Sequence, residues 1–491
     1  MSTKIAVVAD THYGIGRPQA KRRCSIGDVL LERAVHRLNM INKPDVVLVL
    51  GDVVDDAAAP DAEERLQTMR NILDTLDAPY IAIPGNHDTD VMQFYRVFDR
   101  PDDTVDLAGI RFLPFIDKDE PRCWASRSTR DIERIKAARN GYGGMIVSLQ
   151  HVCLAPPSEE KRPPYNYTNA TDVIAAMKEA RVTLSISGHH HPGGHDILDE
   201  PVTFVTAPGL CESPFPFLEI TVDGAAVTTQ RHELKMPEEL QLVDNHVHTP
   251  MAYCSGNMDI EKSISLAHEF GLAGITFTEH SGQLYFDSKA YWQREWLDGG
   301  MAAAEAEHDR MEQYLQLKAD HEDDFARFSL EIDCDAQGGL LVKPGHRKLF
   351  SGQLGSVHAV PGLSRKIPPS QESSDKFLSM IESLCKAGVS VLAHPMRVYH
   401  RARWTPPEEL FEPIAQLLEQ YAVAAELNIH GSNIPPLGFV KECLNHGVRF
   451  SFGGDAHNLF QIGDFACHID LLREAGYDGD LKDVLIEREE L

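Results

Sequence analysis

The first half of the chain repeats one pattern, in which a short apolar run ends in a polar cluster containing Asp, Asn or His. Continuous apolar runs are typical of buried strands, and ligands collect at the carboxyl ends of such strands. Amphipathic stretches between the runs predict helices, so the pattern indicates an α/β fold. The predicted strands are Lys4–Ala9, Asp45–Leu50, Pro79–Pro84, Met145–Leu149 and Thr183–Ser187, and the predicted helices include Asp61–Leu76 and Ala170–Ala180.

After His191 the pattern changes to shorter strands separated by turn residues, which predicts an antiparallel section closing the first domain. A polar segment that contains Pro237 then separates two self-contained patterns. We therefore predict one domain over 1–236 and a second over 240–491. The strands of the closing section are predicted at Val202–Ala207, Phe217–Val222 and Val227–Gln230.

The second half again alternates strands and helices, over roughly 250 residues, which predicts a closed or nearly closed barrel. Its first strand is expected just before Asp244. The further predicted strands are Gly274–Thr278, Phe328–Ile332, Gly355–Val357, Val389–Leu392, Ala424–Leu427 and Val448–Phe452, and the predicted helices are Ile260–Phe270, Met301–His321 and Asp375–Ala387.

Composition restricts the function. The chain has 491 residues, of which 43% are hydrophobic and 25% charged, as in ordinary soluble proteins. Its formal net charge of −27 argues against binding of long nucleic acid, which relies on cationic contacts to phosphates. No apolar run is long enough for a membrane span, and no secretory signal is expected. The nine cysteines form no CxxC pair, which favours reduced thiols and a cytoplasmic location.

Five predicted strands of the first half end in residues that suit metal ions. Two divalent ions held about 3.5–4 Å apart need a bridging carboxylate together with oxygen and imidazole ligands from several strands. Each motif alone is weak, but the five in succession predict a binuclear metal centre. The motifs are Asp10-Thr-His12, Gly51-Asp52-Val-Val-Asp55, Gly85-Asn86-His87-Asp88, Gln150-His151 and Gly188-His189-His190-His191.

The combined pattern resembles the calcineurin-like metallophosphoesterases over nearly all of 1–235, and within them the cyclic-nucleotide-phosphodiesterase-like branch. The resemblance implies a four-layer α/β/β/α sandwich and a water nucleophile whose pKa the two ions lower. It also implies that His87 protonates the leaving oxygen. Asp55 is expected to hold a histidine or a loop, and His190 to point away from the metals. The implied ligands are Asp10, His12, Asp52 and His191 for one ion, and Asp52, Asn86, His151 and His189 for the other, with Asp52 bridging.

The strand ends of the second half carry a different set of His, Glu and Asp residues. The segments are Asp244-Asn-His-Val-His-Thr-Pro250, Phe277-Thr-Glu-His280, Leu330-Glu-Ile-Asp333, Gly355-Ser-Val-His358, Ala393-His-Pro395 and Gly454-Asp-Ala-His457. This set resembles the polymerase-and-histidinol-phosphatase (PHP) family, specifically its histidinol-phosphatase-like members, and implies a distorted (β/α)7 barrel. The implied ligands are His246, His248, Glu331 and Asp455 for one ion, Glu331, His358 and His394 for a second, and His280 with His457 for a third.

One position departs from that family. Many relatives have a further His or acid shortly after the His-x-His motif, where this chain has Met251–Asn257. Cys254 in this stretch is either a ligand of the third ion or a bystander. Arg397, Arg401 and Arg403 follow His394 and are candidates for binding a phosphate group, because guanidinium groups pair with phosphate oxygens in a bidentate manner.

The resulting hypothesis is a bifunctional metal-dependent phosphoesterase that acts on a small phosphorylated substrate. The first domain would cleave a phosphodiester, cyclic or nucleotide-derived, and the second would remove phosphate from the resulting monoester. The expected cofactors are Mn, Fe or Zn ions, two in the first domain and two or three in the second. The alternatives are a nuclease or end-processing enzyme, and one catalytic domain with a metal-stabilised regulatory module. The sequence indicates no oligomeric state.

Overall fold

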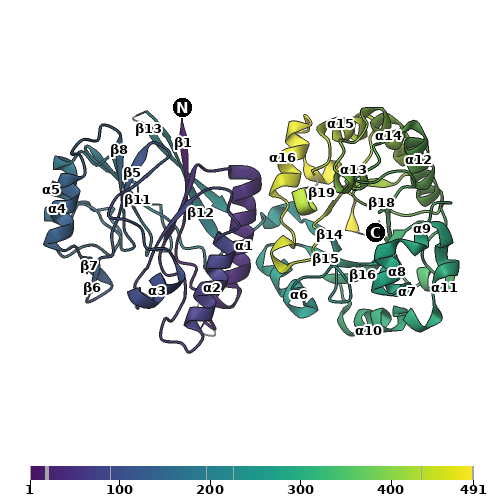
Figure 1. Cartoon of the computed structure of the whole chain (residues 1–491), viewed down its shortest axis with the longest axis horizontal. Helices are drawn as coiled ribbons and strands as arrows, with labels where there is room; N and C mark the ends of the chain where they lie inside the picture. The colour runs from purple at the N-terminus through teal and green to yellow at the C-terminus, as the bar shows by residue number, and fades with distance from the viewer. Residues whose placement is uncertain are drawn as a thin grey trace. The chain divides into compact units, whose positions relative to one another are not determined.

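The computed structural model describes residues 2–16, 21–88, 90–194, 196–224, 226–432 and 434–488. The chain forms two compact units, Met1–Lys235 and Met236–Leu491, which are coloured purple to teal and teal to yellow in Figure 1. None of the helices in these described ranges combines the length and apolar character that a bilayer span requires.

The first unit contains two sheets with helices on their outer faces (Figure 1). The sheet with strand order β13-β12-β1-β2-β3 pairs β1, β2 and β3 in parallel and β12 antiparallel to β1. Its strands are β1 (Thr3–Val8), β2 (Val46–Leu50), β3 (Tyr80–Ile83), β12 (Pro216–Asp223) and β13 (Ala226–Glu233). The sheet with order β10-β11-β9-β8-β5-β4 contains β4 (Val105–Leu107), β5 (Ile110–Pro114), β8 (Met145–Leu149), β9 (Leu184–Ser187), β10 (Ile197–Asp199) and β11 (Val202–Thr206), and a separate hairpin is formed by β6 (Lys118–Glu120) and β7 (Trp124–Ser126).

Apolar side chains hold these layers together. Leu48 and Phe112, from opposite sheets, belong to one buried cluster between the sheets. A second buried cluster packs Val173 and Met177 beneath the other face of the second sheet. The order of layers is therefore helix, sheet, sheet, helix. The helices are α1 (Gly27–Arg37), α2 (Ala62–Leu73), α3 (Val91–Val97), α4 (Thr129–Ala137) and α5 (Ala170–Glu179).

The expected antiparallel section is correct for β12 and β13 but wrong for Val202–Ala207. That segment forms β11, which pairs in parallel with β9 and antiparallel with β10, so it belongs to the second sheet. Its apolar side chains are buried along the whole strand, because it lies inside the sheet rather than at a solvent-facing edge.

The second unit is built on seven strands that pair in parallel in chain order, from β14 to β20. An isolated parallel bridge joins Val247, at the end of β14, to Ala456, which follows β20, so the barrel is nearly closed. The strands are β14 (Val243–Val247), β15 (Gly274–His280), β16 (Ala326–Asp333), β17 (Leu354–Ser356), β18 (Val391–Leu392), β19 (Ala424–Asn428) and β20 (Phe450–Gly453).

Helices surround this barrel (Figure 1). They are α6 (Ile260–Glu269), α7 (Ser281–Tyr285), α8 (Ser288–Gln293), α9 (Glu295–Gly299), α10 (Met311–His321), α11 (Pro344–Arg347), α12 (Gln371–Lys386), α13 (Arg397–Ala402), α14 (Phe411–Tyr421), α15 (Leu437–Asn445) and α16 (Ala466–Glu474).

The helix expected over Met301–His321 is wrong in its first half. Two short 3-10 turns, Gly300–Ala303 and Ala306–His308, precede α10, which begins only at Met311. The Asp309 carboxylate accepts the backbone N–H of Met311 at 3.0 Å, and such a local bond starts a helix rather than continuing one.

Candidate metal centres

The five motifs of the first unit meet at the carboxyl ends of their strands, around the buried Asp52. Its Oδ2 lies 3.4 Å from His12 Nε2 and 3.3 Å from His151 Nε2. Its Oδ1 accepts the backbone N–H of His87 at 2.7 Å. Asp52 thus stands between groups from several strands, where a bridging carboxylate would stand.

The other predicted ligands adjoin this group. Asn86 Oδ1 lies 3.0 Å and His189 Nδ1 3.1 Å from His151 Nε2. Asp10 Oδ2 accepts the backbone N–H of His189 at 2.8 Å, and Asp10 Oδ1 lies 3.5 Å from His191 Nε2. The structure therefore brings together all seven residues predicted from the sequence for this centre.

Two histidines are oriented by acceptors behind them. His151 Nδ1 donates to the carbonyl oxygen of Leu50 at 2.7 Å, and His191 Nδ1 donates to Glu212 Oε1 at 2.7 Å. Each ring therefore turns its Nε2 toward the centre, which is the usual arrangement of metal-binding histidines. Glu212 was not predicted from the sequence, since nothing in its local pattern distinguishes it.

A cation fits the donor atoms present. Asp10 Oδ1 and His189 Nε2 are buried and have no hydrogen-bond partner among the described residues. Ligand atoms of Asp52, His151 and His189 lie within 4.8 Å of one another. Buried polar atoms left without partners are costly unless an ion or water satisfies them.

The electrostatics keep the central carboxylate ionised. Burial alone raises the pKa of Asp52, but the charges of His151 and His12 outweigh it and hold the pKa well below its usual range. Burial lowers the pKa of His151, yet the Asp52 carboxylate raises it to about 10. Burial and the neighbouring His151 charge lower the pKa of His189 to about 4. A divalent ion would replace these protons as the source of positive charge.

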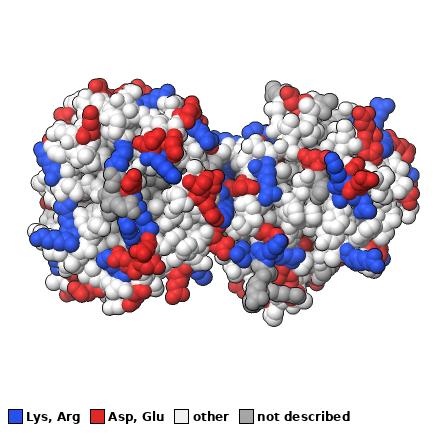
Figure 2. Space-filling view, turned by 180° about the vertical axis from the view of Figure 1, so that it is seen from behind, with Lys and Arg blue, Asp and Glu red and all other residues white. Residues whose placement is uncertain are grey.

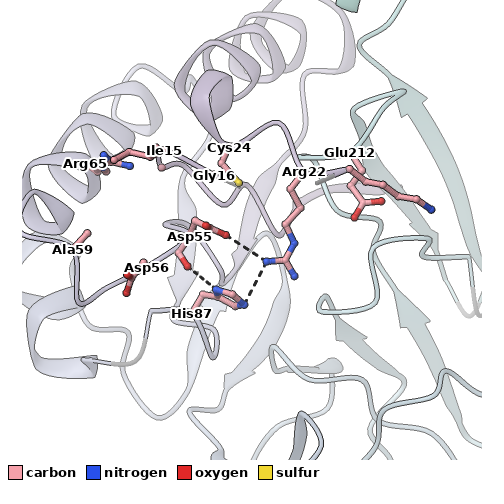
Figure 3. A pocket seen from close by; sticks show the side chains of 12 residues that line it. Ile15, Gly16, Arg22, Cys24, Asp55, Asp56, Ala59, Arg65, His87 and Glu212 are labelled. Atoms are coloured by element: carbon pink, nitrogen blue, oxygen red, sulfur yellow. Dashed lines mark hydrogen bonds and ion pairs between the residues drawn. The ribbon is translucent and has the colours of Figure 1, made fainter. Parts of the chain in front are cut away.

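His87 and Arg22 face a cavity of about 780 Å³ beside the centre (Figure 3). His87 Nδ1 donates to the Asp55 carbonyl oxygen at 2.6 Å, which leaves Nε2 facing Arg22 Nη1 at 3.5 Å. Arg22 Nη1 also lies 3.4 Å from Asp55 Oδ1 and 3.3 Å from His12 Nδ1. In the sequence, Arg22 was only part of a short basic run, so its place here is known from the tertiary structure alone.

Asp55 lies against His12, whereas the expectation that His190 points away from the metals stays a prediction. Asp55 Oδ1 lies 3.3 Å from His12 Nδ1, on the far side of that ring from Asp52. The His190 ring has its centroid 6.1 Å from that of Tyr165.

Several predicted ligands have left-handed backbone conformations, which side chains other than glycine seldom adopt. The set comprises Asp10, His12, Asp52, His189, His394 and Asp455, with φ between 31° and 69°. Strain of this kind clusters at functional sites. Gly85 shows how tight the packing is, because a Cβ there would lie 2.3 Å from Asp52 Oδ1.

The second unit has its own buried carboxylate at the centre, Glu331 on β16. Glu331 Oε1 lies 2.8 Å from His394 Nε2 and 3.3 Å from His358 Nε2. Glu331 Oε2 lies 3.6 Å from His246 Nε2 and contacts His280 Nδ1. His246 Nε2 and Glu331 Oε2 are buried without a hydrogen bond among the described residues, as expected of atoms that converge on an ion.

Acceptors behind the rings again set their orientation. His246 Nδ1 donates to Glu426 Oε1 at 2.7 Å, and His358 Nδ1 donates to Asp333 Oδ1 at 2.6 Å. Glu426 was not predicted, although a charged residue inside the apolar strand β19 is a signal that could have identified it.

Asp455 lies on the other side of the cluster. Its Oδ1 is 2.8 Å from His248 Nε2, and its Oδ2 is ion-paired with Arg397. Of the arginines considered for phosphate binding, Arg397 is therefore engaged by a buried carboxylate. Arg401 lines a cavity of about 390 Å³ above the cluster, whereas Arg403 is exposed and is not part of that lining.

Cys254 lies between the two histidines predicted for a third ion. Its Sγ is 3.1 Å from His457 Nε2 and 3.4 Å from His280 Nε2. Ring nitrogens of His248, His280 and His457 lie within 4.8 Å of one another. Around a tetrahedral zinc ion, with Zn–N about 2.0–2.1 Å and Zn–S about 2.3 Å, nitrogen and sulfur ligands stand about 3.5 Å apart. The donor set therefore fits a cation.

The charges of the second cluster resemble those of the first. Burial raises the pKa of Glu331, but neighbouring histidines, His280 and His358 first among them, hold it well below its usual range. Burial and the Arg397 charge lower the pKa of His394 to about 3. Burial raises the pKa of Cys254 to about 12, so its thiol would lose a proton only to a bound cation.

The exterior carries no extended basic surface on the face seen in Figure 2, where Lys and Arg are interspersed with Asp and Glu. This distribution agrees with the acidic composition. That face therefore has no extended positive surface to which long nucleic acid could bind.

Comparison with known proteins supports the assignment of the first unit. Residues 3–193 match the sequence model of a family described as calcineurin-like phosphoesterase. This match confirms the predicted calcineurin-like metallophosphoesterase domain and supports a metal-dependent hydrolase. A stretch of 84 residues is 31% identical to a probable glycerophosphodiester phosphodiesterase GpdQ of Arcobacter nitrofigilis. It covers 17% of this chain and 29% of the relative, so the chain spans under a third of that relative's length.

Two similar solved structures are both phosphatases. A dimetal phosphatase from Danio rerio has a TM-score of 0.37 and 16% identity, over 47% of this chain and 96% of the other. A histidinol phosphate phosphatase from Lactococcus lactis has a TM-score of 0.33 and 18% identity, over 48% of this chain and 94% of the other. The PHP resemblance of the second half stays a prediction.

Proposed function

We propose that the chain is a bifunctional metal-dependent phosphoesterase, in which the first unit cleaves a small phosphodiester and the second removes phosphate from the resulting monoester. The observation that carries the proposal is the presence of two separate buried clusters. Each centres on a carboxylate, Asp52 or Glu331, surrounded by histidines whose ring nitrogens converge on it. Each has its own cavity.

In the first unit, Asp10, His12, Asp52, Asn86, His151, His189 and His191 would hold two divalent ions. Bound there, the ions would lower the pKa of a water molecule and neutralise phosphate oxygens. His87 has its Nδ1–H held by the Asp55 carbonyl, so its Nε2 is directed to carry a proton to the leaving oxygen. Arg22, beside that nitrogen, would bind a phosphate oxygen.

In the second unit, His246, His248, Glu331, His358, His394 and Asp455 would hold two ions, and His280, His457 and Cys254 a third. The imidazole and carboxylate ligands accept Mn, Fe or Zn, whereas a thiolate at the third position favours Zn. Arg397 would keep Asp455 oriented through their ion pair. Arg401 is left to meet the substrate at the cavity.

The two roles are separable by mutation of the full-length chain. Asp52→Asn weakens contacts to both ions of the first unit and should abolish diester cleavage while leaving phosphate release from a monoester. Asp455→Asn should keep diester cleavage and stop phosphate release, so that the monoester accumulates. Glu312→Gln, on an exposed face of α10, is the matched control and should change neither activity.

Mass spectrometry of products, combined with a phosphate assay, follows both steps. A probe diester such as glycerophosphoethanolamine tests the first unit, since the partial relative is named for glycerophosphodiesters. If Asp455→Asn still yields free phosphate, or if Asp52→Asn also silences monoester hydrolysis, the division of labour is wrong.

A further inference from the structure

The cavity above the second cluster is lined by groups that favour an anion. Its lining includes Arg397 and Arg401, four histidines that include His280 and His358, and several neutral polar side chains, but no carboxylate among the described residues. Glu331 and Asp455 lie beneath it, fully buried. The chain has a net charge of −27, so a cavity lining without acidic side chains stands out from the rest of the protein and favours a negatively charged ligand.

One of the two arginines is not neutralised. Arg397 is paired with Asp455, whereas Arg401 forms no ion pair with a described carboxylate. A further arginine, Arg294, interacts electrostatically with Arg401. Burial lowers the pKa of Arg294, and the positive charge of Arg401 lowers it further. Two guanidinium groups that repel one another are stabilised by an anion that contacts one or both.

The cavity also carries an aromatic surface. Trp292, on α8, lines the cavity and remains 46% exposed, although indole is among the most costly side chains to leave in water. The buried Tyr291 ring supports it in an edge-on arrangement, with the centroids 5.2 Å apart. An indole that packs on a buried ring and is exposed to a cavity is suited to stacking on a planar ring of a ligand.

We infer that Trp292 and Arg401 form a subsite for the alcohol part of the monoester substrate. The subsite would take a planar ring, stacked on Trp292, and a further negative charge, bound by Arg401. It would disfavour substrates whose alcohol part carries an amine, because their cation would approach the guanidinium group of Arg401. This inference rests on the proposed phosphomonoesterase activity of the second unit and names its substrate class.

Matched substrate pairs test the two contacts separately in the full-length chain carrying Asp52→Asn, which silences the first unit. Adenosine 5′-monophosphate and ribose 5-phosphate share the reacting ester and differ by the ring. The pair 3-phosphoglycerate and glycerol 1-phosphate differs by one carboxylate, and ethanolamine phosphate carries an amine. Phosphate release gives kcat/KM for each.

The ring-bearing member of the first pair should be preferred. Trp292→Ala should lower that preference roughly 10-fold, as expected for loss of one stacked base, and Trp292→Phe should restore most of it. Arg401→Gln should lower the preference for 3-phosphoglycerate over glycerol 1-phosphate by about 10-fold, as expected for loss of a charged hydrogen bond. Arg473→Gln, an exposed arginine of α16, is the control and should leave both ratios unchanged.

The outcomes separate the inference from the function on which it rests. If all five phosphate esters are hydrolysed but the kcat/KM ratios within each pair stay the same in Trp292→Ala and Arg401→Gln, the subsite is refuted. The proposed phosphatase activity is then unaffected. If ethanolamine phosphate is the best substrate, the charge argument is refuted. If none of the five is hydrolysed by the metal-loaded protein, the proposed function itself fails.

Discussion

Glu426 allows a direct test of the idea that buried acceptors orient the histidines of the second cluster. Its Oε1 accepts the His246 Nδ1–H at 2.7 Å, and its Oε2 accepts the backbone N–H of His394 at 2.6 Å. Glu426→Gln keeps the shape but has one oxygen and one NH2 group. Either His246 or His394 must then face a donor instead of an acceptor.

The size of the effect follows from this count. A buried N–H left without an acceptor costs about 1–3 kcal/mol. Where the donor is a ring that binds metal, loss of such a partner lowers metal affinity by about 10- to 100-fold. We therefore expect the ions of the second unit to leave Glu426→Gln at a free Zn²⁺ concentration about 10- to 100-fold higher than in the unaltered protein.

The assay is equilibrium dialysis of the full-length protein against zinc buffers, followed by metal analysis. Phosphate release from a monoester should fall with the lost ions, while diester cleavage persists. Glu212→Gln is the matched control in the first unit, since Glu212 accepts the His191 Nδ1–H at the same 2.7 Å. Glu212→Gln should weaken zinc binding and diester cleavage in the first unit and leave phosphate release intact. The effect should be smaller than that of Glu426→Gln, because the Glu212 side chain is 28% exposed and water can replace it.

The reasoning would be refuted by a folded Glu426→Gln protein whose zinc affinity and phosphate release equal those of the unaltered chain. A loss of thermal stability with unchanged zinc affinity would refute it as well. That result would mean that Glu426 supports the barrel but does not orient the ligands.

Three other perturbations address the remaining roles. His87→Ala should lose about 10²–10⁴ in rate on a diester with an alkyl leaving group but far less on a 4-nitrophenyl ester, and equal losses would remove His87 from the acid role. Cobalt-loaded protein should show a near-ultraviolet thiolate-to-cobalt absorption band that disappears in Cys254→Ser, whereas an unchanged spectrum would make Cys254 a bystander. Gly85→Ala should displace the Asp52 carboxylate, whose Oδ1 would lie 2.3 Å from the new Cβ, and metal analysis should show loss of ions from the first unit only.

Much of the fold follows from local pattern. Largely buried strands such as β2 and β8 read as apolar runs, and the structure places both ends of each within one residue of the predicted bounds. The second sheet was predicted less completely, because β4 and β10 have only three residues each and Arg111 interrupts the apolar run of β5. The start of α10 was missed because it is marked by the hydrogen bond from the Met311 N–H to the Asp309 carboxylate and not by hydrophobic periodicity.

The sequence by itself determined which residues stand at the carboxyl ends of the strands, since the chain runs directly from each apolar segment into its polar cluster. The family resemblances that these motifs carry then imply Asp52 and Glu331 as shared carboxylates. Only the tertiary structure decided what lies behind and above these residues. Glu212 reaches His191 from 21 positions away and Glu426 reaches His246 from 180. Such hydrogen bonds depend on which strands and loops become neighbours in space, and a local sequence pattern does not encode which distant segments meet.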